Sequence, residues 1–477
     1  MVTNSLKNKT IKGVFWSGFE QFSVQGIHFL VLLVIARLLT PDDFGLVGML
    51  AIFIAVAQSF IDSGFSQALI RKQDRTEKDT STVFFFNLIA SVIIYILLFL
   101  LAPFVSSFYN EPQLTLLMRV LCIVVVVNAF SVVQRAIYTS SLDFKTPARC
   151  SFISAIISGA IGVMMAIRGA GVWTLVWQQL INAGSCSIML WLFSKWHPQW
   201  CFSWVSFKKL FSFGSNLLLS GLIDTIYNNA YTLVIGKFFS ASSLGNYTQA
   251  DKFSRLPSAN LTTVLVKVTY PVFCQKQDDN YTLTVLYRKF IRLSAFLIFP
   301  IMCIMAGVSS SLIYVLLGEK WLEAATLIKP LCFALMWYPI HAINLNILKV
   351  KGRSDIFLKL EIIKKIIGTT ILIICIPMGI TAMCYGLIIT SLVSLGINTF
   401  YTNRFISVGL VQQLSDISRT LIVSLITFII TLVITHFIKY NIWGLLIGII
   451  SGSVFYMLVS LIGNVKEITY VKEIVKQ

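Results

Sequence analysis

Three basic residues, Lys252, Arg255 and Lys267, fall in a largely apolar stretch, residues 243–269. A charged side chain in hydrocarbon costs roughly 2.5–3.5 kcal/mol or more, so such residues are candidates for function. The planar guanidinium of Arg255 can hold a phosphate through two hydrogen bonds, and the lysines can assist as point charges. Two alternatives stay open: Asp251, four residues before Arg255, can neutralise it, and Lys267 can extend to the membrane surface.

Uncharged polar and acidic residues recur at helical spacing in other apolar stretches. Ser17, Gln21, Gln25 and His28 form one stripe with Glu20 beside it, and Asn216, Ser220, Asp224 and Asn228 form a second; Gln58 and Asp62 form a pair, and Gln249 precedes the cations. Amide and hydroxyl groups can replace water around a polar ligand at little net cost. Gln21, Gln25, Asn216, Asp224, Asn228 and Gln249 are therefore candidates to line a polar cavity. The alternative is that these stripes join helices to one another.

Four titratable residues in these stretches can carry protons or Na⁺. They are Glu20, His28, Asp62 and Asp224. Histidine changes charge near neutral pH, and carboxylates inside a membrane often serve proton relays. The sequence does not choose among the four, and a structural histidine at position 28 is an equal alternative.

The composition identifies the elements that must position these side chains. The 477 residues are 57% hydrophobic and only 12% charged, against about 25% charged in soluble proteins. Apolar runs long enough to cross a ~30 Å hydrocarbon core recur from end to end. The chain is therefore expected to be an all-α polytopic membrane protein. The predicted spans are 13–38, 43–64, 82–105, 114–134, 150–168, 171–194, 210–236, 243–269, 290–312, 325–348, 356–377, 380–401, 418–438 and 442–463, about 14 transmembrane helices in all.

The net charge of +18 follows the topology. Most of the 38 Lys and Arg residues, Arg135 among them, fall in alternate connections, whereas the others hold only Arg37, Arg168, Lys237, Lys320 and Lys439. The positive-inside rule then places both termini and the basic connections in the cytoplasm. The charge gives no support to nucleic-acid binding.

An internal repeat organises the chain. LVIARLLTPDDFGLVGM (33–49) matches LVIGKFFSASSLGNYTQ (233–249), and LMRVLC (117–122) matches LIKPLC (327–332). In each copy of the first pair, residues 40–43 or 240–243 supply helix caps, Pro41 suits a first turn, and Gly45 or Gly245 allows close helix approach. We expect parallel six-helix lobes at 1–200 and 205–405 around a central cavity, followed by two additional helices and a cytoplasmic tail at 406–477.

Several motifs carry a family resemblance that covers essentially the whole chain. They are ARLLTPDDFGLVGM (36–49), DSGFSQALIRK (62–72), FYNEPQL (108–114), SLDFK (141–145) and LLGEKWLEAATLIKPLC (316–332). Together they resemble bacterial polysaccharide exporters, most of all the colanic-acid-type branch of lipid-linked oligosaccharide flippases. These belong to the multidrug/oligosaccharidyl-lipid/polysaccharide exporter superfamily.

The resemblance implies a function in the bacterial cytoplasmic (inner) membrane. Such a protein moves undecaprenyl-pyrophosphate-linked oligosaccharide repeats to the periplasmic leaflet for O-antigen, capsule or exopolysaccharide, with its polyprenyl tail in membrane lipid. The polysaccharide polymerase machinery is a further implied partner. The resemblance makes Arg255, Lys252 and Lys267 the candidates for the pyrophosphate. It likewise makes the polar residues that line the expected cavity candidate sugar contacts, namely Gln21, Gln25, Asn216, Asp224, Asn228 and Gln249.

Other classes of function are less favoured. A cation-coupled multidrug exporter of the same superfamily would want an acidic cavity, and a membrane glycan polymerase or ligase would need a large external loop. A scaffold without transport would not need the polar stripes. We therefore expect no enzyme activity. The nine cysteines show no ligand spacing, so no metal or cofactor is expected, and no nucleotide-binding P-loop motif occurs.

Overall fold

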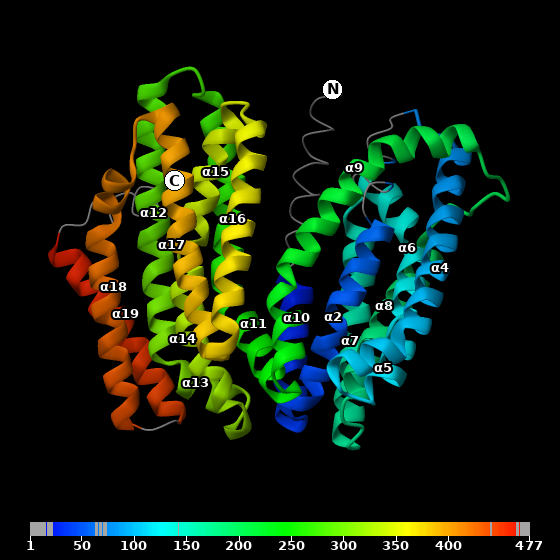
Figure 1. Ribbon diagram of the computed structural model, residues 1–477, viewed down its shortest axis with the longest axis horizontal. Coiled ribbons are helices and arrows are strands. Elements are labelled where there is room, and N and C mark those ends of the chain that lie inside the picture. The colour runs from blue at the N-terminus through cyan, green and yellow to red at the C-terminus, as the bar shows by residue number, and fades with distance from the viewer. Residues whose placement is uncertain are drawn as a thin grey trace. The chain divides into compact units, whose positions relative to one another are not determined.

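The computed structural model describes residues 16, 22–62, 65, 69, 74–141, 143–438, 441–463 and 467, without the side chains at 62, 209, 210, 212–217, 220 and 354. Within these residues all regular structure is helical, as expected (Figure 1). The first described helix is Phe22–Leu38. The others are α2 (Pro41–Asp62), α4 (Glu77–Tyr109), α5 (Leu114–Leu121), α6 (Ile123–Ser140), α7 (Lys145–Ile167), α8 (Trp173–Phe193), α9 (Trp204–Asn228), α10 (Ala230–Phe238), α11 (Ala241–Gln275), α12 (Asn280–Gly307), α13 (Ser309–Leu316), α14 (Leu322–Leu335), α15 (Tyr338–Val350), α16 (Ser354–Cys375), α17 (Ile380–Ile406), α18 (Leu410–Ile438) and α19 (Ile442–Ile462), with short 3₁₀ turns at Glu319–Trp321 and Ile376–Met378.

Many of these helices are long and apolar enough to cross a membrane. Nine spans among the described residues meet that condition, and Phe22–Leu38 is a shorter apolar helix. Every predicted span overlaps one or two of these helices. The protein is a multi-pass membrane protein, and the exact number of crossings stays a prediction.

The helix starts in the repeated segment form as the sequence predicts. At the start of α2, the Asp43 amide donates to Thr40 Oγ1 over 3.4 Å, and the Thr40 amide donates to Asp43 Oδ2 over 2.9 Å. At the start of α11, the Ser243 amide donates to Ser240 Oγ over 3.1 Å. Each bond satisfies a donor that a helix start leaves unpaired.

The two glycines of the repeat allow a very close approach. A Cβ added to Gly45 would lie 1.8 Å from the carbonyl oxygen of Ala241, and one added to Gly245 would lie 1.9 Å from that of Pro41. Neither distance is possible for a real side chain, so the start of α2 meets the start of α11 only because both positions are glycine. This contact confirms the predicted role of both residues.

The chain forms two compact units, Met1–Gly245 and Asn246–Gln477. In unit 1, α7 packs on α8, and α6 packs on both α4 and α8. In unit 2, α18 packs on α12 and α19, so the last two helices are an integral part of that unit. The division falls inside α11, later than the predicted repeat boundary at 200–205. The repeats at 1–200 and 205–405 are a statement about sequence equivalence and stay a prediction.

A polar pocket in unit 1 and candidate residues elsewhere

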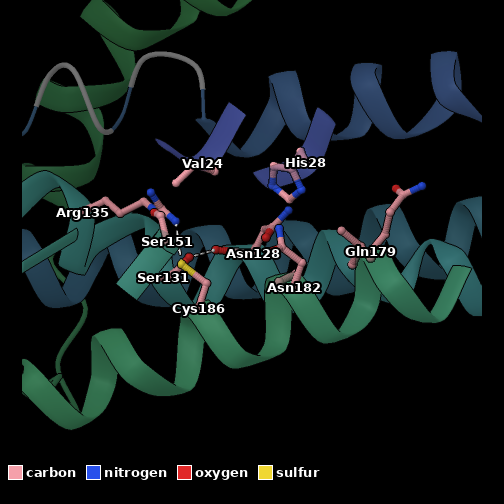
Figure 2. Close-up of a pocket in the computed structure, with 11 residues that line it drawn as sticks. Val24, His28, Asn128, Ser131, Arg135, Ser151, Gln179, Asn182 and Cys186 are labelled. Carbon is pink, nitrogen blue, oxygen red and sulfur yellow. Dashed lines mark hydrogen bonds between the residues drawn. The ribbon is translucent and has the colours of Figure 1, made fainter. Parts of the chain in front are cut away.

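A polar pocket of about 260 Å³ lies inside unit 1, between the helix Phe22–Leu38 and helices α6, α7 and α8 (Figure 2). It is lined by Val24, His28, Val124, Asn128, Ser131, Arg135, Ser151, Gln179, Asn182, Ala183 and Cys186. Most of these side chains carry a hydrogen-bonding group, and no carboxylate is among them. The pocket is therefore suited to a polar or anionic ligand.

Two helices supply most of the polar wall. Asn128, Ser131 and Arg135 recur at i, i+3 and i+7 on α6. The same spacing on α8 brings Gln179 and Cys186 to the pocket, with Asn182 between them. Residues so spaced share one helix face, and Figure 2 shows both faces directed toward the same space, with His28 above it.

The hydrogen bonds of the pocket leave much polar capacity unused. Arg135 Nη2 donates to Cys186 Sγ over 2.9 Å, and a thiol is a weak acceptor. Asn128 Nδ2 donates to Gln58 Oε1 over 3.1 Å, and Asn182 Oδ1 accepts from Ser158 Oγ over 3.4 Å. A ligand can therefore take up the remaining donors without breaking a strong internal bond.

Sequence reasoning found only His28 among these residues. Arg135 counted as a basic residue of a cytoplasmic connection, whereas the structure places it in α6 with the pocket. The helical spacing of Asn128, Ser131 and Arg135 was a usable signal. Nothing in the sequence alone placed α8 opposite.

The predicted cation site on α11 is partly occupied by its own neighbour. Arg255 Nε donates to both carboxylate oxygens of Asp251, over 2.8 and 2.7 Å. The two side chains are 53% and 22% exposed, so the pair is accessible to solvent or a ligand. The ion pair that we considered as the alternative therefore forms, while the terminal Nη groups of Arg255 donate to none of the described residues. Lys252 and Lys267 are exposed.

The other predicted sugar contacts differ in burial. Gln249 is fully buried, and neither of its amide atoms has a hydrogen-bond partner among the described residues. Asp224 and Asn228 are exposed on α9, and Gln25 is half-buried. Between Asp224 and Asn228, Thr225 Oγ1 lies 2.8 Å from Ser59 Oγ on α2, which joins the two helices.

Four of the predicted residues cannot be placed. Glu20 and Gln21 lie outside the described residues, as do the side chains of Asp62 and Asn216. Their roles stay predictions.

A second polar cluster lies inside unit 2 and is fully connected. The Tyr287 hydroxyl donates to Asn344 Oδ1 over 2.7 Å, and the Gln413 amide donates to the Tyr287 oxygen. Asn344 Nδ2 donates to Gln413 Oε1 over 3.3 Å. All three side chains are buried, and they join α12, α15 and α18.

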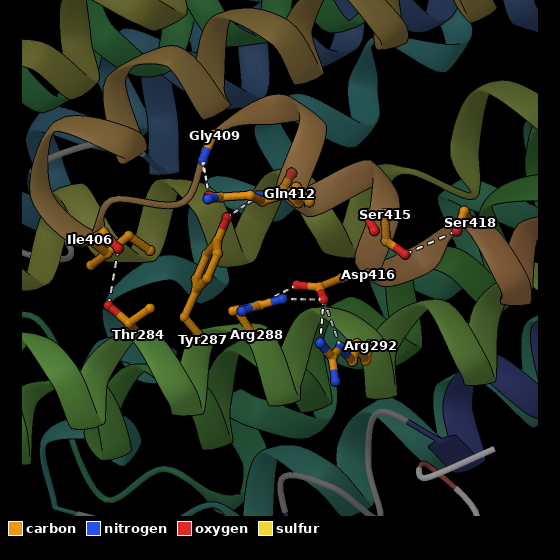
Figure 3. Close-up of polar contacts among 11 residues, drawn as sticks. Thr284, Tyr287, Arg288, Arg292, Ile406, Gly409, Gln412, Ser415, Asp416 and Ser418 are labelled. Atoms are coloured by element: carbon orange, nitrogen blue, oxygen red, sulfur yellow. Dashed lines mark hydrogen bonds and ion pairs between the residues drawn. The ribbon is translucent and has the colours of Figure 1, made fainter. Parts of the chain in front are cut away.

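One turn beyond Gln413, a carboxylate binds two arginines (Figure 3). Arg288 donates to both oxygens of Asp416, through Nε and Nη2, each over 2.7 Å, and Arg292 donates through its Nε over 3.0 Å. Asp416 is not among the site residues that the sequence predicts. The spacing of Arg288 and Arg292 at i, i+4, which puts both on one face of α12, was the signal available.

Comparison with known proteins gives these observations their context. Residues 34–326, more than half of the chain, match the family described as "Polysaccharide biosynthesis protein". The chain is 25% identical over 355 residues to the teichuronic acid biosynthesis protein TuaB of Bacillus subtilis (strain 168), covering 74% of this chain and 73% of TuaB. It is also 25% identical over 366 residues to the lipopolysaccharide biosynthesis protein WzxC of Escherichia coli (strain K12), covering 76% and 74%.

The fold has a solved counterpart. The lipid II flippase MurJ, in an inward closed conformation, superposes with a TM-score of 0.77 over 94% of this chain and 98% of that chain, at 14% sequence identity. At that identity the likeness shows the fold alone. The helical, membrane-spanning character of this chain and the family match agree with the resemblance seen in the sequence. This chain belongs to the polysaccharide biosynthesis protein family.

Proposed function

We propose that this protein moves polyprenyl-pyrophosphate-linked oligosaccharide units across the bacterial cytoplasmic membrane by alternating access. The product serves the synthesis of a surface polysaccharide such as O-antigen, capsule or exopolysaccharide. The observation that carries the proposal is the family match over residues 34–326 in a chain with a transporter fold. The polar pocket inside unit 1 supports it, because a sugar needs hydrogen-bonding partners when it leaves water.

In this proposal, Arg255, Lys252 and Lys267 bind the pyrophosphate. The exposure of all three and the unused Nη groups of Arg255 support that role. Gln21, Gln25, Asn216, Asp224, Asn228 and Gln249 are proposed sugar contacts. Glu20, His28, Asp62 and Asp224 are the proposed carriers of a coupling ion.

A deletion strain tests the activity. We expect loss of the surface polysaccharide and accumulation of lipid-linked repeat units on the cytoplasmic leaflet, both restored by the wild-type gene. The readout is the accessibility of the lipid-linked sugar to an enzyme added to inside-out and right-side-out vesicles. Unchanged polysaccharide together with increased drug sensitivity would instead establish the multidrug exporter.

A pair of variants tests the pyrophosphate site. Arg255→Ala should abolish complementation at an unchanged protein level, because it removes the guanidinium. Asp251→Asn should retain export, because it frees the same guanidinium from its partner. If both variants lower the protein level and export equally, the Arg255–Asp251 pair is a structural ion pair and the site is rejected.

The proposed orientation places both termini in the cytoplasm. It rests on the distribution of lysine and arginine between alternate connections. Reporter fusions at each terminus that are active only on one side of the membrane test it directly. A periplasmic signal from either terminus would reject it.

A further inference from the structure

The charge of the unit 1 pocket is unbalanced. Arg135 contributes a guanidinium, none of the described residues that line the space is an aspartate or a glutamate, and the one hydrogen bond of Arg135 to a described residue goes to the Cys186 thiol. Asp416 shows the contrasting arrangement in unit 2, where a carboxylate receives two arginines. A guanidinium that faces a polar space without a carboxylate is a ready partner for an anionic ligand.

The rest of the lining indicates what kind of anion fits. Beside the one guanidinium, the wall offers amides from Asn128, Gln179 and Asn182 and hydroxyls from Ser131 and Ser151. These groups both donate and accept hydrogen bonds, as sugar hydroxyls do. A single guanidinium balances the one charge of a carboxylate, whereas a pyrophosphate would bring at least two charges and leave one uncompensated.

The size and shape of the pocket agree with one sugar ring. Its volume of about 260 Å³ lies just below the range of about 300–1,000 Å³ that is usual for pockets of drug-sized ligands. Figure 2 shows Arg135, Ser151 and Cys186 toward one end and Gln179 at the other. A sugar acid could therefore place its carboxylate at the Arg135 end and its ring hydroxyls toward Gln179. Because α6 ends at Ser140 on the predicted cytoplasmic side, the Arg135 end faces the leaflet from which the substrate is loaded.

We propose that this pocket is a subsite for an acidic monosaccharide, whose carboxylate binds Arg135 and whose hydroxyls bind the amides of α6 and α8. The inference rests on the proposed function, since it assigns the class of sugar that the oligosaccharide contains. It is separate from the pyrophosphate site proposed on α11. The transported repeat unit therefore includes a uronic-acid-type residue.

Binding of small probes to the purified full-length protein in lipid nanodiscs tests the subsite. Saturation-transfer NMR is recorded with sodium glucuronate, glucose and sodium pyrophosphate. We expect glucuronate to bind at least about tenfold more tightly than glucose, since a charge-assisted pair is roughly twice as strong as a neutral one. Arg135→Gln should remove that difference, and Arg135→Lys should restore only part of it because lysine lacks the planar fork.

Arg149→Gln is the matched control. Arg149 lies on α7, on the same predicted side of the membrane, and is exposed outside the pocket. The Arg149→Gln variant should bind glucuronate as the wild type does. Thermal unfolding shows whether each variant is folded. If Arg135→Gln does not fold, Arg135→Lys still tests the subsite.

Three outcomes would overturn the subsite. The first is pyrophosphate binding that depends on Arg135 and exceeds glucuronate binding. The second is glucuronate binding that is the same in the wild type and Arg135→Gln, and the third is no glucuronate binding by the wild type. None of the three bears on the proposed flipping activity, which the deletion strain tests separately: loss of flipping in that strain supports the function even where the subsite is rejected.

Discussion

The polar cluster of unit 2 and the polar pocket of unit 1 differ in how their hydrogen-bonding groups are paired. In unit 2, Tyr287, Asn344 and Gln413 bond to one another, and Asp416 receives two arginines. In unit 1, the polar faces of α6 and α8 converge on a space, and Arg135 reaches only a thiol among the described residues. Both clusters lie among apolar helices, where polar groups are costly unless they are paired.

The difference separates a structural cluster from a binding one. A fully connected network stabilises the packing of the helices that contribute to it, and removing one member leaves the others unsatisfied. A cluster with unused donors around a space loses little stability when one member is removed, because few internal bonds depend on it. Substitutions should therefore affect stability in unit 2 and ligand binding or export in unit 1.

The largest effect is expected at Asp416. Asp416→Asn removes the charge that holds Arg288 and Arg292 on α12 to α18, and Asp416 is only 4% exposed. We expect the free energy of unfolding to fall by about 3 kcal/mol, at the low end for a buried pair because Arg288 is 42% exposed. Thermal unfolding of the purified protein in detergent measures the change.

The exposed pair Arg353–Asp355 provides the control for that measurement. Its side chains are 46% and 63% exposed, and the bond to Arg353 holds the pKa of Asp355 at about 2. Exposed ion pairs contribute little to stability, so Asp355→Asn should leave the unfolding transition nearly unchanged. Equal losses in the two variants would contradict the stabilising role expected of the buried Asp416 carboxylate.

A second, smaller effect compares two asparagines. Asn344→Ala leaves Tyr287 and Gln413 without their shared partner, and we expect a loss of about 2 kcal/mol in the free energy of unfolding. Asn182→Ala removes only a 3.4 Å contact with Ser158, so its effect on stability should stay within about 0.5 kcal/mol. Export of surface polysaccharide, measured in the same strains, should fall several-fold for Asn182→Ala because a sugar contact is lost.

The comparison fails if the asparagines behave alike. If Asn182→Ala exports polysaccharide at the wild-type level, the Asn182 amide does not contact the sugar. Full stability of Asn344→Ala would show that the network of unit 2 contributes little to packing.

Features that depend on residues close together in the sequence, such as helix caps and apolar spans, can be predicted from it. The cap at Thr40 and the close approach at Gly45 and Gly245 depend on a few neighbouring residues and on a visible repeat, so the sequence predicts both. Apolar length likewise predicts membrane-spanning helices without any knowledge of packing. The orientation inferred from the positions of lysine and arginine stays a prediction.

Features that depend on which helices meet could not be predicted. Arg135 and Asp416 look like ordinary charges near helix ends, and their roles depend on α8 and α12 lying opposite them. Arg255 and Asp251 were recognised because they are four residues apart on one helix. Tertiary pairing across helices is therefore the information that the sequence pattern lacked.

A small effect on stability is also expected where the pocket is filled. Ala183→Leu adds three carbons beside a space that is already present, so the free energy of unfolding should change by less than about 1 kcal/mol. The same change at Ala295, which is fully buried in α12, has no space to enter and should cost about 1–3 kcal/mol. If the space receives a sugar, Ala183→Leu should nevertheless reduce export strongly. A stable Ala183→Leu protein with normal export would show that this pocket is not used in transport, because its volume could then be removed without consequence.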